Sequence, residues 1–279
     1  MRERHTMPAL LKITRKTFAD KVIGYTDEAL FERSGVRILF TEREGGTSPT
    51  PYDSLNLAEH VGDDPSLVRS NRSMLLRALG KADDPQRIIC AKQVHSDGVA
   101  LLDASYLRSG TSATAGYASL DAADALLTSQ KDLPLLMLFA DCVPIILVAE
   151  GPVLSVGVVH AGWRGALLGL PGKAARMLAD LAGCAPSEIL AYIGPHICGR
   201  CYEVGKEVAD SFAREYGRTA VLGRNVDLSE VVTIDLLRAG LTTSAIAKVG
   251  KCTLESTDKF YSFRASGVTG RHGALVMIE

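Results

Sequence analysis

The sequence has almost no excess of charge and no long hydrophobic run. Lys and Arg number 31 against 32 Asp and Glu, a net charge of −1, so no basic arm for nucleic acid or polybasic membrane anchor is expected. The longest apolar stretch, residues 133–149, is interrupted by Asp141 and Pro144, and it is too short and too polar to span a bilayer. The N-terminus shows no secretory signal, and no membrane partner is predicted.

Cysteine and histidine are also scarce. Six cysteines in 279 residues do not make a disulfide framework, so a reducing, cytoplasmic compartment is expected. Six histidines without a His-x-His motif fall short of the roughly ten imidazoles that a multicopper oxidase needs. The chain also lacks a GxGxxG motif, a GxSxG nucleophile elbow and a complete phosphate loop.

What is present predicts a folded α+β protein. Hydrophobic residues make up 47% and charged residues 23% of the chain, as in ordinary globular domains. Apolar runs predict strands, several of them covered on both faces, at 36–40, 87–94, 99–102, 133–139, 143–149, 153–159, 261–264 and 273–278. A hairpin-like turn, 95–98, is expected between the second and third of these strands.

Helices are expected where caps and apolar stripes coincide, at 65–79, 163–181, 203–216 and 235–248. Pro171-Gly172 predicts a kink or split in the second of these helices. Strands and helices alternate without a strict βαβ rhythm, which favours a single domain with a mixed β-sheet flanked by helices. We expect a catalytic domain over residues 35–279, preceded by an N-terminal extension over residues 1–34.

Polar residues interrupt the apolar strands at three places, and each interruption carries a potential metal ligand. The three residues are His95, Cys142 and His160, separated by 47 and 18 residues. Structural zinc sites use closely spaced pairs, whereas catalytic sites gather three ligands from separate strands. A buried cysteine acting as a small hydrophobe and two hydrogen-bonded histidines are the alternative. Asp141 favours the metal site, because a carboxylate in an apolar run is costly to bury without a role.

Two further features are less specific. Cys198-Gly-Arg-Cys201 is half of a zinc ribbon or a redox pair, and without a second CxxC motif a structural or incidental role is favoured. Gly162 and Gly165 allow close backbone approach next to a helix start, which suits an anion or a sugar hydroxyl. Arg164 beside them is either a phosphate ligand or a surface ion-pair partner.

The three interruptions resemble the signatures of the laccase-domain family, also called polyphenol oxidase, peptidoglycan-editing factor or multifunctional purine nucleoside phosphorylase. They read Gln93-Val94-His95, Ala140-Asp141-Cys142-Val143-Pro144 and His160-Ala161-Gly162-Trp163-Arg164-Gly165. Further similar segments are Thr41-Glu42-Arg43-Glu44-Gly45-Gly46, Ser54-Leu55-Asn56-Leu57, Tyr202-Glu203-Val204 and Thr269-Gly270-Arg271. The resemblance covers roughly residues 35–279 in the family's order, which makes it specific although each motif alone is weak.

The resemblance implies a fold sometimes classed with cysteine hydrolases, and zinc bound by His95, Cys142 and His160, with copper as an alternative metal. It also implies phosphorolysis of adenosine, inosine and S-methyl-5′-thioadenosine, with added adenosine deaminase activity. Asp141 and Cys142 are then the catalytic candidates, with Asp141 shuttling a proton. The candidate substrate-binding residues are Arg43, Asn56, Gln93, Arg164 and Arg264. The expected partners are purine nucleosides and phosphate, in a monomer or homodimer.

Three other functions remain open. In the first, Cys142 is a nucleophile and His160 its base in an amide hydrolase acting on cell-wall precursor peptides. This hypothesis competes with metal binding for the same sulfur. A scaffold with a structural metal is the second, and the scattered ligand spacing argues against it. A copper-dependent polyphenol oxidase is the third, and the few histidines argue against that.

Overall fold

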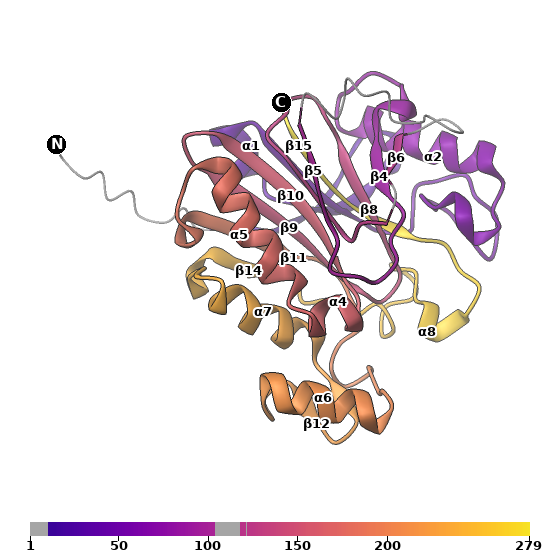
Figure 1. Cartoon of the computed structure of the whole chain (residues 1–279). Coiled ribbons are helices and arrows are strands. Elements are labelled where there is room, and N and C mark those ends of the chain that lie inside the picture. Colours follow the sequence, from indigo (N-terminus) through magenta and orange to yellow (C-terminus); the bar gives the residue numbers. More distant parts are fainter. Residues whose placement is uncertain (1–10, 104–117, 121) are drawn as a thin grey trace.

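The computed structural model describes residues 11–103, 118–120 and 122–279. Over these residues two mixed β-sheets lie face to face, with helices on both outer surfaces, in the layer order α, β, β, α (Figure 1). The single α+β domain that the sequence predicts, with mixed sheets flanked by helices, is therefore confirmed.

The first sheet holds the following described strands, in spatial order: β1 (Thr14–Thr17), β2 (Ile23–Thr26), β3 (Val36–Thr41), β15 (His272–Ile278), β8 (Leu135–Phe139), β4 (Ile89–Ala91) and β6 (Ala118–Leu120). Helix α2 (Pro65–Ala78) covers its outer face through Leu75 and Leu76. Because β1 and β2 pair with β3, the expected domain boundary at residue 34 falls inside this sheet. Helix α1 (Glu28–Ser34) connects β2 to β3.

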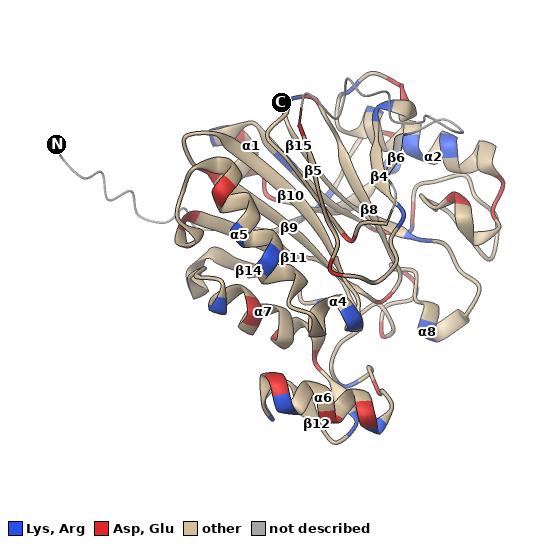
Figure 2. Ribbon diagram, viewed as in Figure 1, with Lys and Arg blue, Asp and Glu red and all other residues tan. Residues whose placement is uncertain are grey.

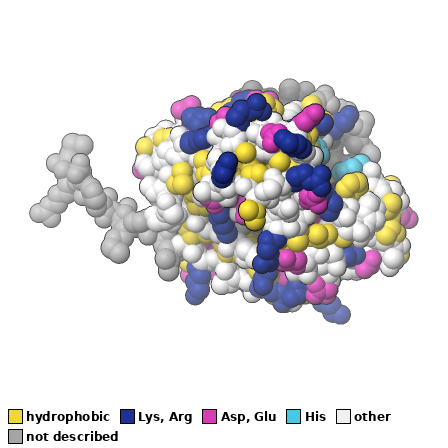
Figure 3. Space-filling view, turned by 90° about the horizontal axis from the view of Figure 1, so that it is seen from below, with side chains coloured by type: hydrophobic (Ala, Val, Ile, Leu, Met, Phe, Trp, Pro, Cys, Tyr) yellow, Lys and Arg dark blue, Asp and Glu magenta, His cyan; other side chains and the backbone are white. Residues whose placement is uncertain are grey.

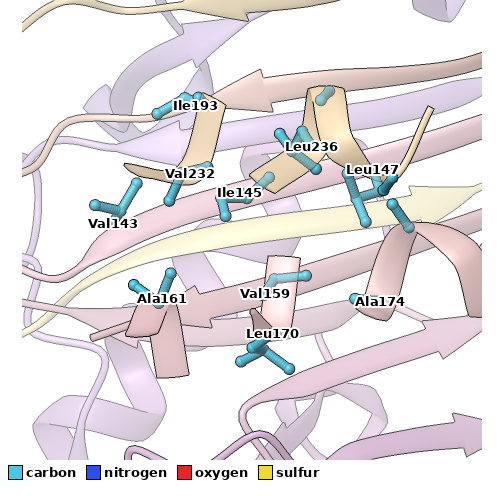
Figure 4. Close-up of a cluster of buried hydrophobic side chains, with 14 of the residues drawn as sticks. Val143, Ile145, Leu147, Val159, Ala161, Leu170, Ala174, Ile193, Val232 and Leu236 are labelled. Carbon is cyan, nitrogen blue, oxygen red and sulfur yellow. The ribbon is translucent and has the colours of Figure 1, made fainter. Parts of the chain in front are cut away.

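The second sheet holds these described strands, in spatial order: β14 (Ile246–Lys248), β11 (Ile189–Ile193), β9 (Val143–Glu150), β10 (Leu154–Ala161), β7 (Ala125–Thr128) and β5 (Val99–Leu102). Its outer face packs against α5 (Leu170–Ala182) and α7 (Leu228–Arg238). Figure 4 shows side chains of these two helices meeting those of β9, β10 and β11.

Strand β9 shows why these segments are apolar throughout. Ile145 and Leu147 point towards α5 and α7, whereas Ile146 and Val148 point into the layer between the two sheets. Successive residues of a strand face opposite sides, so a strand covered on both faces needs a continuous apolar run. The strands expected at 36–40, 133–139, 143–149, 153–159 and 273–278 are confirmed within one to two residues.

Local capping residues explain most helices. Asp64 accepts a hydrogen bond from the Ser66 N–H at the start of α2, and Pro65 occupies its first turn. The segment 163–181 is split, as expected, into α4 (Trp163–Leu167) and α5, because Gly169 adopts a φ of 72° between them. Helix α6 (Lys206–Tyr216) lies within the range expected for it.

Three expectations are wrong. The 87–102 hairpin does not form, because β4 pairs with β8 in the first sheet and β5 with β7 in the second. The helix expected over 235–248 ends with α7 near Gly240, which has a φ of 107°, and residues 246–248 form β14 instead. The strand expected over 261–264 is replaced by helix α8 (Phe263–Ser266), since Ser262 caps it by accepting from the Ala265 N–H.

The short elements complete the described fold. A small antiparallel pair, β12 (Val221–Leu222) and β13 (Asn225–Val226), lies beside α6 at the lower end of the molecule in Figure 1. Short 3-10 helices occupy Ala19–Lys21, Glu59–Val61, Pro85–Arg87, Pro186–Glu188 and Thr243–Ala245.

Charged side chains of both signs share the surface. Figure 2 places them mainly on helices and loops, with both signs on α6, and Figure 3 shows them interspersed over the face seen from below. This distribution agrees with the balanced composition. No helix in the described part of the chain is both long and apolar enough to cross a membrane.

Candidate metal centre

The structure brings His95, Cys142 and His160 together. His95 follows β4, Cys142 lies in the turn between β8 and β9, and His160 lies near the end of β10. Their donor atoms all lie within 4.8 Å of one another. The Cys142 Sγ is 3.8 Å from the His95 Nε2, and the two imidazole rings meet edge to face at 4.8 Å. The site therefore forms where strands of both sheets end.

The failed hairpin explains how His95 reaches this place. The segment between β4 and β5 crosses from the first sheet to the second, and His95 lies on that crossing with a φ of 59°. Asp141, next to Cys142, has a φ of 94°. Such backbone conformations are unfavourable for residues other than glycine and persist where the surrounding structure imposes them, often at functional sites.

Asp124 organises two of the three donors. Its buried carboxylate accepts a hydrogen bond from the His160 Nδ1 at 2.8 Å, and it also accepts from the backbone N–H groups of Val94, His95 and Ser96. Burial raises the pKa of this carboxyl, but the bonds from His160 and Ser96 outweigh it and lower the pKa to about 2. An ionised Asp124 holds the Nδ1 proton, so the Nε2 is the His160 atom that would bind a metal, after giving up its own proton.

The thiol and the imidazoles perturb one another strongly. Burial raises the pKa of the Cys142 thiol, but the charge of His160 and hydrogen bonds from both histidines lower it to about 6. Burial lowers the pKa of His160, but Cys142 and Asp124 raise it to about 9. A thiolate is the form of cysteine that binds metals and attacks electrophiles, so the site stabilises the reactive form of Cys142.

Gly162 allows the three donors to meet. A Cβ atom at this position would lie 2.6 Å from the His95 Cδ2 and 3.3 Å from the Cys142 Sγ. The first of these distances is far below van der Waals contact, so any larger residue displaces the His95 ring. The sequence pointed to close approach at Gly162, and the structure shows that the side chains approaching it are those of His95 and Cys142, two of the candidate donors.

The donor set fits a metal ion. Two imidazoles and one thiolate suit zinc or copper, and bonds of about 2.0–2.3 Å require donors about 3.3–3.8 Å apart. The observed separations, up to 4.8 Å, come within that range after small side-chain rotations. Three donors from the described residues leave a fourth tetrahedral position for water or substrate.

Asp141 lies beside the centre, but its carboxylate is engaged elsewhere. Its Oδ1 accepts from the Thr253 hydroxyl at 2.6 Å, and its Oδ2 accepts from the Arg264 backbone N–H at 2.7 Å. Its carbonyl accepts from the Ile197 N–H. These bonds place Asp141 as an anchor for the turn that carries Cys142, and they do not direct it towards the three donors.

Two of the candidate substrate-binding residues hold the backbone. The Gln93 side chain donates to the Leu138 carbonyl and accepts from the Leu138 N–H. Asn56 is fully buried and bonds with Ala58, Asp63 and the Arg271 N–H. Since both ends of each amide already have partners, neither residue is arranged to bind a substrate.

The candidate arginines divide into two groups. Arg43 donates to the Asp53 and Thr257 carbonyls and stacks 4.6 Å above the Tyr261 ring, and the exposed Arg164 stacks on Trp163. Arg264 alone of these three lines the cavity described next. Arg43 and Arg164 are therefore not brought to that cavity.

An open cavity of about 520 Å³ adjoins the centre. It is lined by Trp163, Tyr202, Glu203, Val204, Gly205, Val208, Arg224 and Arg264. Trp163 directly follows Gly162 in the chain. Burial and the nearby charge of Cys142 raise the pKa of Tyr202 to about 12. These two links place the cavity near the centre, although none of the three donors is among its lining residues.

Sequence reasoning missed Asp124, Tyr202 and Arg224. Asp124 stands at the start of β7, as an acid beside an apolar run. The same signal singled out Asp141, so the pattern was available for Asp124. Tyr202 stands in the Tyr202-Glu203-Val204 segment that resembles the family, but no role for it followed from the sequence. Arg224 had no distinguishing local signal, because the cavity assembles the two residues from separate loops.

The fold and the site define the class of protein: an αββα domain with a candidate mononuclear metal centre. A family model described as multi-copper polyphenol oxidoreductase laccase matches residues 37–279, and the chain belongs to this family. A purine nucleoside phosphorylase of Streptomyces coelicolor is 38% identical over 251 residues, which cover 88% of this chain and 97% of that protein. The purine nucleoside phosphorylase YlmD of Bacillus subtilis is 34% identical over 83% of this chain and 84% of its own length.

Solved structures agree with the fold. YlmD of Geobacillus stearothermophilus is 31% identical with a TM-score of 0.82, over 98% of this chain and 100% of that chain. The Bacillus licheniformis hypothetical protein YfiH is 29% identical with a TM-score of 0.84, over 95% of this chain and 99% of that chain. The laccase-domain resemblance that the sequence motifs indicated is thus confirmed.

Proposed function

We propose that this chain is a metal-dependent purine nucleoside phosphorylase, acting on adenosine, inosine and S-methyl-5′-thioadenosine, with added adenosine deaminase activity. The observation that carries the proposal is the convergence of three donors, His95, Cys142 and His160, near an open cavity whose wall includes two aromatic rings, two arginines and Glu203. The relatives named purine nucleoside phosphorylase support the phosphorylase part of this proposal. Zinc is the proposed metal, with copper as the alternative.

The cavity suits a nucleoside and an anion. Its volume of about 520 Å³ lies within the usual range for small-molecule sites, about 300–1,000 Å³. Trp163 and Tyr202 offer aromatic faces on which a purine ring stacks. Arg264 lies 4.9 Å from the Tyr202 ring, and Arg224 also lines the wall. Arg264 donates to the Glu203 carbonyl and Arg224 pairs with the Glu203 carboxylate. A guanidinium has five N–H donors and binds phosphate through two parallel hydrogen bonds. Because these two arginines line the cavity, we assign phosphate binding to them.

Phosphorolysis exchanges one bond for another. A phosphate oxygen forms a bond to the ribose C1′, and the C1′–N9 bond breaks with its electron pair leaving on the purine, which takes up a proton. A metal held by the three donors supplies Lewis acidity to an oxygen in the site. The chain's own residues bind and orient: aromatic rings hold the base, arginines hold phosphate, and Asp124 fixes His160.

Deamination at the purine C6 requires a proton carrier near the metal. Asp141 is the residue that the sequence offers for this role, but Thr253 and the Arg264 N–H occupy its two oxygens. We therefore assign Asp141 to positioning of the Cys142 turn. The proton carrier for deamination is then a different acid or water.

The test is phosphate dependence. Purified protein is incubated with inosine, adenosine or S-methyl-5′-thioadenosine, with and without phosphate, and the free base and sugar 1-phosphate are measured by chromatography. We expect base release only with phosphate, and its loss in His95→Ala, which lacks a metal ligand. Base release without phosphate, or equal rates in the His95→Ala variant, would contradict the proposal. Inosine formed from adenosine reports deamination separately.

A second function has a specific observation in its favour. Cys142, His160 and Asp124 stand in the order nucleophile, base and orienting acid, with the His160 ring bonded to Asp124 at 2.8 Å. Cysteine hydrolases use such a constellation, and a cell-wall precursor peptide would be the substrate. His95 then has no assigned role, which is why we favour the metal centre.

Replacement of Cys142 by Ser separates the two functions. If Cys142 is a ligand, metal content and activity fall together, since a hydroxyl is a much weaker zinc ligand than a thiolate. If Cys142 is a nucleophile, the Cys142→Ser protein keeps the metal content of the wild type and loses only turnover. Full zinc content together with no activity in that variant would move the assignment to a cysteine hydrolase.

A further inference from the structure

A second group of donors converges outside the site described above. Cys198, Cys201, Cys252 and Glu255 place one ligand atom each within 4.8 Å of one another, and the six cysteines of the chain are all free. The first two residues lie in the turn before α6, and the other two follow β14. The CxxC motif that appeared as half a site in the sequence is completed by a segment about 50 residues further on.

The backbone around these thiols is tightly built. Cys201 and Tyr202 both donate their N–H groups to the Cys198 carbonyl at 3.0 Å, which closes the CxxC turn. The Cys198 N–H donates to the Cys252 Sγ at 3.3 Å, which holds the second segment against the CxxC turn. A Cβ at Gly199 would lie 2.8 Å from the Asp227 Cβ, so the turn accepts only glycine at this position.

We propose that Cys198, Cys201, Cys252 and Glu255 hold a structural Zn²⁺. Three thiolates and one carboxylate form a four-coordinate set of the kind that zinc takes. A tetrahedral site with Zn–S bonds of about 2.3 Å has sulfur atoms about 3.8 Å apart, and the observed cluster needs only a small contraction to reach it. The four residues form two closely spaced pairs, Cys198 with Cys201 and Cys252 with Glu255, which is the spacing typical of structural zinc.

The position of Glu255 favours a metal over a disulfide. Its Oε1 lies 3.8 Å from the Cys198 Sγ and 3.6 Å from the Cys201 Sγ, so a carboxylate oxygen approaches two sulfurs at once. A disulfide joins only two cysteines, so it would not explain why a third thiol and a carboxylate converge at the same place. Arg200 pairs with Glu255 at 3.0 Å on the solvent side, where it orients the carboxylate as partners of metal ligands do.

A Zn²⁺ ion at this second cluster would stabilise the wall of the neighbouring cavity. The ion would join the 198–201 turn to the 252–255 loop. Both segments also contact Asp141: the Ile197 N–H donates to its carbonyl, and the Thr253 hydroxyl donates to its Oδ1. Tyr202 and Glu203, which follow Cys201 directly, line the cavity. A metal bound here stabilises the folded state. It also fixes the cavity wall and the turn carrying Cys142, without touching the substrate.

The first test is metal stoichiometry, which is independent of activity. Elemental analysis of protein purified without chelator should give two zinc equivalents per chain in the wild type and one in Cys201→Ser or Cys252→Ser. Cys184→Ser, a half-buried cysteine outside both clusters, is the matched control and should keep two. The double variant His95→Ala and Cys142→Ala should keep one, and lose it when Cys201→Ser is added.

A second measurement covers the case in which the serine variants fail to fold. The double variant lacking His95 and Cys142 is loaded with Co²⁺, whose absorption reports thiolate ligands. Strong thiolate-to-cobalt charge-transfer absorption and a higher Tm than the metal-free form are expected. Two outcomes overturn the proposal. One is a double variant that binds no metal, and the other is a wild-type mass two hydrogens lower with zinc absent, which indicates a Cys198–Cys201 or Cys198–Cys252 disulfide.

Discussion

Asp124 holds His160 at two points, although the two residues are 36 positions apart in the chain. The His160 Nδ1 lies 2.8 Å from the Asp124 Oδ1, and the His160 N–H donates to the Asp124 carbonyl at 2.7 Å. The same carboxylate accepts from the N–H groups of Val94, His95 and Ser96. One buried acid thus fixes the positions of His160 on β10 and of the loop that carries His95.

The first prediction concerns Asp124→Asn. The amide keeps the shape of the carboxylate but loses its charge and part of its acceptor capacity. Loss of such a partner typically weakens metal binding by about 10–100-fold, and we expect a decrease of that size at the His95–Cys142–His160 centre. Competition titration with a chromophoric chelator measures it. Asp97→Asn is the control, because Asp97 pairs with Lys173 near the same loop. An unchanged affinity in Asp124→Asn would refute the orienting role.

The second prediction concerns Gly162→Ala. The added methyl group would lie 2.6 Å from the His95 Cδ2, so the ring must rotate away and the centre loses one ligand. Metal content after dialysis should fall well below that of the wild type, while the overall fold, followed by circular dichroism, stays intact. Gly205→Ala is the matched control, because a Cβ there meets nothing within 4 Å. Equal metal content in both variants would show that His95 is not a ligand.

The third prediction concerns the pH dependence of Cys142 in the metal-free protein. The pKa of its thiol is lowered to about 6, below the ordinary value of about 8.5. The thiolate therefore persists at neutral pH and is lost only as the pH falls through about 6. Alkylation by iodoacetamide, followed by peptide mass spectrometry, should rise with a midpoint near pH 6 and level off before pH 8.

His160→Gln is the control for this pH profile. It removes the imidazolium whose charge lowers the pKa of Cys142, so the alkylation midpoint should move up towards that of an ordinary thiol. Cys184, mapped in the same digests, provides an internal reference, because burial and Glu188 raise its pKa. A wild-type midpoint near 8.5 would mean that Cys142 and His160 do not interact in solution.

The fourth prediction separates the arginines. Arg264→Gln should raise the KM for phosphate about tenfold, or ~1.4 kcal/mol, with a smaller effect on the KM for inosine. Arg43→Gln should leave the phosphate KM nearly unchanged, because the Arg43 guanidinium is bound to Asp53 and Thr257. Steady-state kinetics with each substrate varied in turn decides between them. A larger phosphate effect from Arg43 would restore it as the phosphate ligand.

Much of the fold follows from local sequence signals. Continuous apolar runs mark the strands covered on both faces, as in β9, because burial of alternate faces requires apolar side chains at every position. The Asp64-Pro65 cap marks the start of α2, because an aspartate and a proline suit the first turn of a helix. The three interruptions at His95, Cys142 and His160 were equally visible, since polar residues in apolar strands stand out.

Pairing between distant segments was not visible. The strands on either side of His95 join different sheets, and residues 246–248 leave a helical pattern to pair with β11. Local propensity is weak compared with such tertiary contacts. The hairpin and the helix expected from these segments were therefore wrong.

The sequence by itself determined which residue types this protein has available: apolar runs for two sheets, three separated candidate metal ligands, and one CxxC motif. Only the tertiary structure decided which of them act together. Asp124 reaches His160, and Cys252 and Glu255 reach Cys198 and Cys201, across 36 and 54–57 positions respectively. Side chains this far apart in the chain meet because strand pairing and sheet stacking bring their segments together, and no local pattern in the chain records that pairing.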